Sequence, residues 1–129
     1  MFDNVNWNEF INNILSYIEK DWNHLIVKAV ISKTSYSAAF WYSENDNDFI
    51  DLYDVIEEEK MDIIFNNTIT ELKKITENLK TDKESIFLTI KVEKTGNVKV
   101  VYRNIKESNK LPYDASLEYL EINENDKIM

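Results

Sequence analysis

The stretch SIFLTIKVEKTGNVKVVYRNIK, residues 85–106, contains the single glycine of the chain, Gly96, between two alternating runs. Apolar or aromatic side chains recur at every second position, at Ile86, Leu88, Ile90 and Val92 and again at Val98, Val100 and Tyr102. Residues two apart lie on one face of a β-strand, and glycine adopts the positive φ of a tight turn without strain. The pattern therefore predicts an antiparallel hairpin that turns at Gly96.

A helix and a second strand pair are predicted before this hairpin. Apolar residues step by three and four positions, as on one face of a helix, at Trp7, Phe10, Ile11, Ile14, Leu15 and Ile18. This spacing predicts a helix over about residues 6–20, with Asn6 as its N-cap. Period-two spacing then predicts two strands joined by a turn near residues 33–35, through Leu25, Val27, Ala29 and Ile31 and through Tyr36, Ala38, Phe40 and Tyr42.

The middle of the chain is predicted to contain a short edge strand and a long helical stretch. FIDLYDV, residues 49–55, has the composition of a strand, and its two aspartates suit a sheet edge. Apolar residues then follow one helical stripe, at Met61, Ile64, Phe65, Ile69, Leu72, Ile75 and Leu79. Because Thr68 and Glu71 have the spacing of a capping box, this stretch is either one long helix or two helices over residues 57–65 and 69–80.

Strand pairs separated by helices predict an α+β fold. We expect an antiparallel sheet of four to five strands with two main helices packed on one face, in the order α-β-β-(β)-α-β-β followed by a tail. The tail, after about residue 112, is expected to form a short helix over about residues 115–122 and then to fray. With 129 residues and 43% hydrophobic content, the chain is expected to form a single domain over residues 1–129.

Composition excludes several kinds of chemistry and suggests a cellular location. The chain has no cysteine, which excludes disulfides, thiolate metal sites and cysteine nucleophiles. One glycine is too few for the glycine-rich loops that bind phosphate. We expect a cytoplasmic protein, because the sequence has no apolar run of eighteen residues and no signal-peptide pattern at its N-terminus.

Negative charge is concentrated in one segment, SENDNDFIDLYDVIEEEKMD, residues 43–62. Residues 44–62 contain nine carboxylates and one lysine, a net charge of −8, whereas the whole chain carries −9. A surface of this sign repels nucleic acid and anionic membranes and attracts basic partners. We therefore expect a basic protein partner, with no direct binding of nucleic acid and no membrane binding.

A calcium loop is one alternative interpretation of the acidic segment. An EF-hand loop needs oxygen ligands at positions one, three and five, glycine at six and glutamate at twelve. With Asp46 at position one, Ile50 stands at position five and Asp51 at position six. With Glu44 at position one, Phe49 stands at position six. The pattern fails in both registers, so we predict no metal site and no cofactor.

Catalysis is weakly supported by the remaining residues. His24 is the single histidine, and no cysteine or activated serine near it in the sequence suggests a nucleophile, so a structural role is expected. Paired carboxylates can hydrolyse glycosides, but nothing beyond the aromatic residues suggests a sugar site. We therefore expect no catalytic residues, and a small carboxylate-based enzyme is the least favoured alternative.

Aromatic and basic residues have mainly structural interpretations. Most aromatic side chains are expected to pack between helices and sheet. Trp41 is the exception, because alternation places it on the opposite face from Phe40 and Tyr42, where we expect an exposed interface anchor. The bases of the C-terminal hairpin are expected to act as solubilising charge on its polar side, at Lys91, Lys94, Lys99, Arg103 and Lys106.

The arrangement over about residues 8–105 resembles the YezG-like immunity proteins, antidotes to bacterial polymorphic nuclease toxins. The similarity lies in an amphipathic N-terminal helix before Trp22, a strand ending in AAFWYS, the acidic FIDLYDV segment, and the hairpin LTIKVEKTGNVKVVYRN. The resemblance implies a non-enzymatic cytosolic protein that binds and blocks a cognate toxin domain.

Charge and resemblance together predict an immunity protein, that is, an antitoxin-like inhibitor. Its acidic surface is expected to bind the basic face of a toxin domain, and we expect this toxin domain to be a nuclease. Carboxylates would steer association, and exposed aromatics would prolong the complex. The predicted partner-binding residues are Trp41, Glu44, Asp46, Asp48, Asp51, Tyr53, Asp54 and Glu58. An acidic DNA-mimic inhibitor of another nucleic-acid enzyme, of the phage anti-defence type, remains the main alternative, and the sequence leaves the oligomeric state open.

Overall fold

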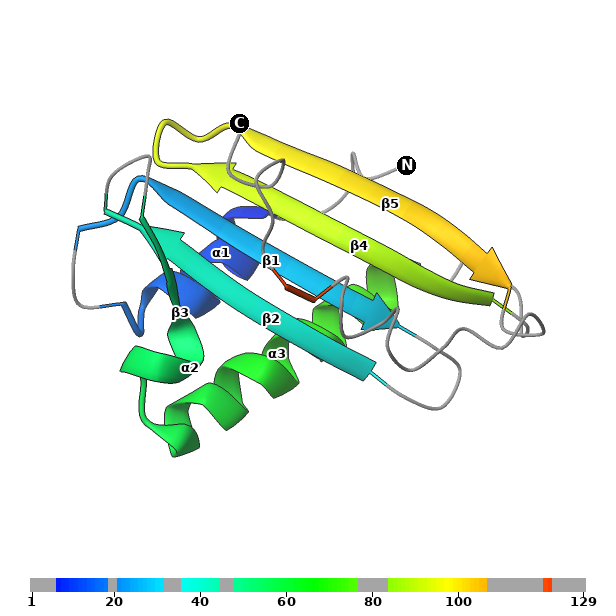
Figure 1. The fold of residues 1–129 in the computed structure, drawn as a ribbon, viewed down its shortest axis with the longest axis horizontal. Coiled ribbons are helices and arrows are strands. Elements are labelled where there is room, and N and C mark those ends of the chain that lie inside the picture. Colours follow the sequence, from blue (N-terminus) through cyan, green and yellow to red (C-terminus); the bar gives the residue numbers. More distant parts are fainter. Residues whose placement is uncertain are drawn as a thin grey trace.

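The computed structural model of the protein describes residues 7–18, 21–31, 36–44, 48–76, 84–106 and 120–121. Its elements are α1 (Trp7–Leu15), β1 (His24–Ile31), β2 (Tyr36–Ser43), β3 (Phe49–Asp51), α2 (Leu52–Val55), α3 (Glu58–Thr76), β4 (Glu84–Glu93) and β5 (Val98–Lys106). The strands form an antiparallel sheet in the order β3-β2-β1-β4-β5 (Figure 1). The predicted α+β class is confirmed.

The main core lies between the sheet and the helices α1 and α3, which pack on the same face (Figure 1). From β1 it receives Leu25, Val27, Ala29 and Ile31, the set that alternation predicted. Phe10 and Ile14 of α1 and Ile64 and Leu72 of α3 bury their apolar stripe against these strands. Burying such side chains is the dominant stabilising contribution to a fold of this size.

Helix α1 is shorter than predicted, ending at Leu15 rather than near residue 20. After it the backbone tightens, because the amides of Tyr17 and Ile18 donate to the carbonyls three residues earlier, at 3.2 and 3.0 Å. This tight turn directs the chain towards β1. The predicted N-cap, Asn6, lies outside the described residues.

Helix α3 is a single helix, as the first of the two alternatives predicted. Thr68 does not begin a second helix, because it lies in the middle of α3 and is buried. The hydroxyl of Thr70 donates to the carbonyl of Asn66 at 2.8 Å, which satisfies this polar side chain within the helix. The polar run at residues 66–68 is therefore compatible with continuous helix.

The hairpin of β4 and β5 is confirmed, with Gly96 at a φ of 105° in its turn. The carboxylate of Glu93 accepts hydrogen bonds from Thr95 and Asn97, each at 3.2 Å, and this fixes the turn. The expected helix over residues 115–122 lies outside the described residues except for Leu120 and Glu121, which form a turn and a bend.

The second face of the sheet, opposite the helices, is also buried, which the sequence did not predict. It is formed by Ile26, Lys28, Val30, Trp41, Phe87, Thr89 and Lys91, each less than a tenth exposed. The ammonium group of Lys28 donates to the backbone carbonyl of Glu121 at 3.1 Å, so residues 120–121 lie over this face (Figure 1). Strand β1 is therefore packed on both sides.

Two predictions of exposure on the second face are wrong. Trp41 is only 6% exposed, because the face to which alternation assigned it is packed rather than open. Lys91 is 7% exposed and stands opposite Ile26, so it is not a solvated charge on the hairpin. Lys94 and Lys99 are exposed, in agreement with the prediction.

Candidate partner-binding surface

The acidic segment folds into three consecutive elements at one edge of the sheet. Strand β3 pairs with β2, α2 follows without a break, and α3 begins after Ile56 (Figure 1). Most of its carboxylates are exposed: Glu44, Asp48, Asp54, Glu57, Glu58, Glu59 and Asp62. Asp46 lies outside the described residues. The sequence run thus places most of its carboxylates in contact with solvent along these elements.

The predicted third strand is wrong in its second half, since it ends at Asp51 and the chain enters α2. The Asp51 carboxylate accepts a hydrogen bond from the amide of Tyr53 at 2.9 Å, which makes it the N-cap of α2. Leu52 is fully buried and fastens this turn to the core. Asp51 is therefore partly a structural residue, whereas the prediction placed it in the binding surface alone.

Two apolar side chains of α2 stand exposed among these carboxylates. Tyr53 is 48% exposed and Val55 is 54% exposed. The Tyr53 ring lies 6.2 Å from the Phe40 ring, tilted by 50°, and its hydroxyl is 3.4 Å from the Ala38 carbonyl. Tyr53 is thus held in place on one side and open on the other, the condition of a preorganised anchor.

The pKa of Tyr53 reports the electrostatics of this surface. Burial raises the pKa above its ordinary value of 10.0, and the nearby carboxylates of Asp51 and Asp62 raise it further. Both carboxylates act because negative charge opposes the formation of a tyrosinate. The exposed aromatic ring therefore lies in a negative potential.

We call the exposed carboxylates of residues 44–62 together with Tyr53 and Val55 the acidic patch. Of the predicted partner-binding residues, Glu44, Asp48, Asp51, Tyr53, Asp54 and Glu58 belong to this region of the structure. Trp41 does not join them at the surface, because its side chain is buried on the second face. Val55 was missed, and its place between Asp54 and Glu57 was the available sequence signal.

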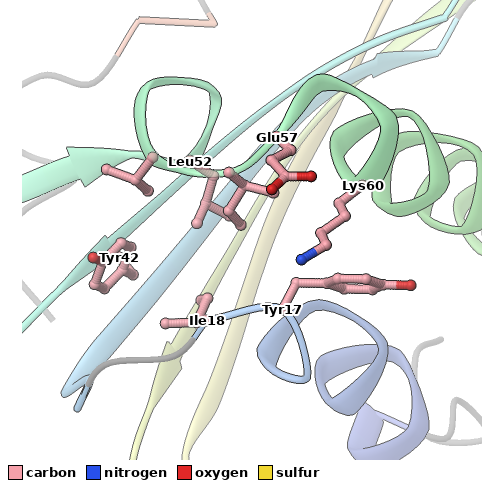
Figure 2. A pocket seen from close by; sticks show the side chains of 8 residues that line it. Tyr17, Ile18, Tyr42, Leu52, Glu57 and Lys60 are labelled. Atoms are coloured by element: carbon pink, nitrogen blue, oxygen red, sulfur yellow. The ribbon is translucent and has the colours of Figure 1, made fainter.

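A cavity of about 200 Å³ lies beside the acidic patch (Figure 2). It is lined by Tyr17, Ile18, Tyr42, Leu52, Val55, Ile56, Glu57 and Lys60. These residues come from the turn after α1, from β2, and from the α2–α3 corner. No sequence pattern connects residues 17–18 with residues 52–60, so this cavity could not be predicted.

Within the described ranges, no group of three or more His, Asp or Glu side chains is arranged to hold a metal ion. His24 stacks on Phe49, with 6.5 Å between ring centroids. None of the described helices is long and apolar enough to cross a membrane.

Comparison with known proteins assigns no family. No protein-family model matches the chain, and no curated protein matches it significantly. The resemblance to YezG-like immunity proteins stays a prediction that rests on the residues quoted above.

Proposed function

We propose that this chain is an immunity protein, a non-enzymatic inhibitor that acts in the cytoplasm by binding the basic surface of a toxin nuclease domain. The observation that carries the proposal is the acidic patch, in which Tyr53 and Val55 are exposed among carboxylates on a short, capped helix. A nuclease needs a basic face to bind phosphate, so an acidic surface is complementary to it.

Charge and apolar contact would play different parts in this complex. The carboxylates attract a basic partner over about one Debye length, roughly 8–10 Å at physiological ionic strength, and so raise the association rate. Exposed Tyr53 and Val55 then bury apolar area on contact and slow dissociation. Tyr53 replaces Trp41 as the principal anchor, since Trp41 is buried.

The test begins with the gene beside the one that encodes this chain, since toxin and immunity genes are adjacent. The toxin domain encoded there is purified, and its nuclease activity is titrated with this chain. We expect complete inhibition at a fixed stoichiometry, with an association rate that falls as salt rises.

A neighbouring gene without a toxin domain, or a toxin that retains full activity at saturating inhibitor, would contradict the proposal. Inhibition of unrelated DNA-binding enzymes with similar potency would instead indicate the DNA-mimic alternative, because mimicry of phosphate charge is not selective for one nuclease.

A further inference from the structure

The cavity between the turn after α1 and the α2–α3 corner adjoins the acidic patch, and its lining combines apolar and aromatic side chains with one carboxylate, Glu57, and one ammonium group, Lys60. We propose that this cavity is a socket for a single arginine side chain of the protein partner. The inference rests on the proposed function in one respect, that the partner presents a basic surface.

The cavity is large enough for a whole side chain. One water molecule needs about 10–15 Å³ of such volume, whereas this cavity offers about 200 Å³. Leu52 is fully buried and Tyr42 is 2% exposed, so both belong to its rigid inner wall. Val55 is exposed and stands at the opening, which connects the cavity with the apolar part of the acidic patch.

The apolar lining suits a long aliphatic stem. Ile18 and Ile56, both half-buried, offer hydrocarbon surface to the cavity, and the fully buried Leu52 lies behind that surface. Arginine buries its methylene groups against such surface while its charged end stays near polar groups. A short acidic or hydroxylated side chain would leave this surface uncovered.

The polar lining and its surroundings favour a cation. Glu57 lines the cavity, and the exposed carboxylates of Asp54 and Glu58 come from the same elements as its lining. The chain already places a cation of its own there: Figure 2 shows the Lys60 side chain extending from α3 towards Tyr17. Lys60 is exposed, so its amine can move into solvent when a partner side chain enters.

Arginine fits this site better than lysine does. A planar guanidinium group stacks on an aromatic ring and binds a carboxylate through two parallel hydrogen bonds. Tyr17 supplies a ring and Glu57 a carboxylate within the same lining. An incoming arginine would therefore take the position of the Lys60 amine and gain contacts that an ammonium group does not make.

The direct test uses a small probe and needs no partner protein. Capped arginine, N-acetyl-L-arginine methylamide, is titrated into the purified chain while backbone amide chemical shifts are followed by NMR. We expect saturable shifts centred on Ile18, Leu52 and Ile56, weaker binding of the capped lysine analogue, and no saturable shifts with the capped glutamate analogue.

Three substitutions and their controls locate the site. Glu57→Gln is expected to lower the affinity for capped arginine about tenfold, because the substitution removes the carboxylate of a charge-assisted hydrogen-bonded pair. Glu9→Gln is the matched control, an exposed carboxylate on α1 outside both the lining and the acidic patch, with an expected change of less than about twofold. Val55→Trp is expected to abolish binding by filling the opening, and Val101→Trp on β5 is expected to leave it intact.

Lys60→Met decides the sign of the charge that the cavity binds. If the cavity is an arginine socket, this substitution removes the competing amine of Lys60 and raises the affinity for capped arginine about twofold or more. Saturable binding of capped glutamate that Lys60→Met weakens would overturn the inference. The absence of any saturable shift with capped arginine would overturn it as well.

The outcomes for socket and immunity function are separable. Binding of the probe without inhibition of a toxin would retain the socket and refute the immunity proposal. Inhibition of a toxin without binding of the probe would retain the immunity proposal and refute the arginine socket.

Discussion

The second face of the sheet and the acidic patch are unusual in opposite ways. The second face buries charged side chains, whereas the acidic patch exposes apolar and aromatic ones. On the second face, Lys28 and Lys91 are buried together with Trp41 and Phe87. On the acidic patch, Tyr53 and Val55 are about half exposed among carboxylates. Lysine is rarely buried without a partner group, and Lys28 donates to the Glu121 carbonyl. The second face therefore serves the fold, and the acidic patch is available for recognition.

The largest effect is expected from Trp41→Ala. Removing a side chain that is 6% exposed from the second face should lower the free energy of unfolding by about 3–5 kcal/mol, measured by urea denaturation. Tyr53→Ala is the comparison, with an expected loss below about 1 kcal/mol. Near-equal losses would break the distinction between the two regions, and a loss below about 1 kcal/mol for Trp41→Ala would restore Trp41 as a candidate anchor.

The next largest effect concerns binding. Tyr53→Ala should weaken the complex with the toxin domain by about 2 kcal/mol or more, measured by calorimetry, because it removes a preorganised aromatic anchor. Val101→Ala is the matched control, since Val101 is 50% exposed on β5 at the opposite edge of the sheet. Equal losses for the two variants would show that the acidic patch is not the interface.

Asp51 tests whether the two roles, cap and charge, can be separated at one residue. Asp51→Ala should destabilise the protein by about 1 kcal/mol because α2 loses its N-cap. Asp51→Asn keeps a capping side chain and should cost less than about 0.5 kcal/mol. Both variants remove the same charge, so they should slow association with the partner equally. Unequal association rates would indicate that the cap, rather than the charge, matters for binding.

The smallest effect concerns pH. Because the pKa of Tyr53 is raised in the folded state, the folded chain holds this proton at pH values where the unfolded chain has lost it. The stabilisation is complete below about pH 10, the unfolded value, and is lost as pH rises through the raised pKa. Tyr53→Phe should remove a late phase from the tyrosinate absorbance titration, and Asp62→Asn should shift that phase to lower pH. A late phase that does not move in Asp62→Asn would contradict the negative potential, because burial alone would then account for the raised pKa.

The sequence predicted the elements with strong periodicity and missed features that depend on tertiary contacts. The β4–β5 hairpin follows from alternation around Gly96, and the core set of β1 follows from the same period. Alternation also assigned Trp41 to the correct face. It could not show that this face is covered, because the contact between Lys28 and Glu121 joins residues far apart in the chain.

The candidate site was predicted in composition but not in shape. The run of carboxylates indicated an acidic surface, and six of the eight predicted residues lie in that region. The conversion of residues 52–55 from strand to helix depends on the hydrogen bond from the Tyr53 amide to Asp51 and on burial of Leu52. That conversion exposes Val55 and creates the cavity, so neither was visible in a linear pattern.

The central claim, that the acidic patch steers a basic partner, is tested most directly by association kinetics. Asp54→Lys combined with Glu58→Lys should lower the association rate constant about tenfold or more at low salt and flatten its dependence on salt. Glu9→Lys combined with Glu71→Lys changes the net charge equally on α1 and near the other end of α3, and should have a much smaller effect. Equal slowing by both double variants, or no slowing by the first, would contradict the claim.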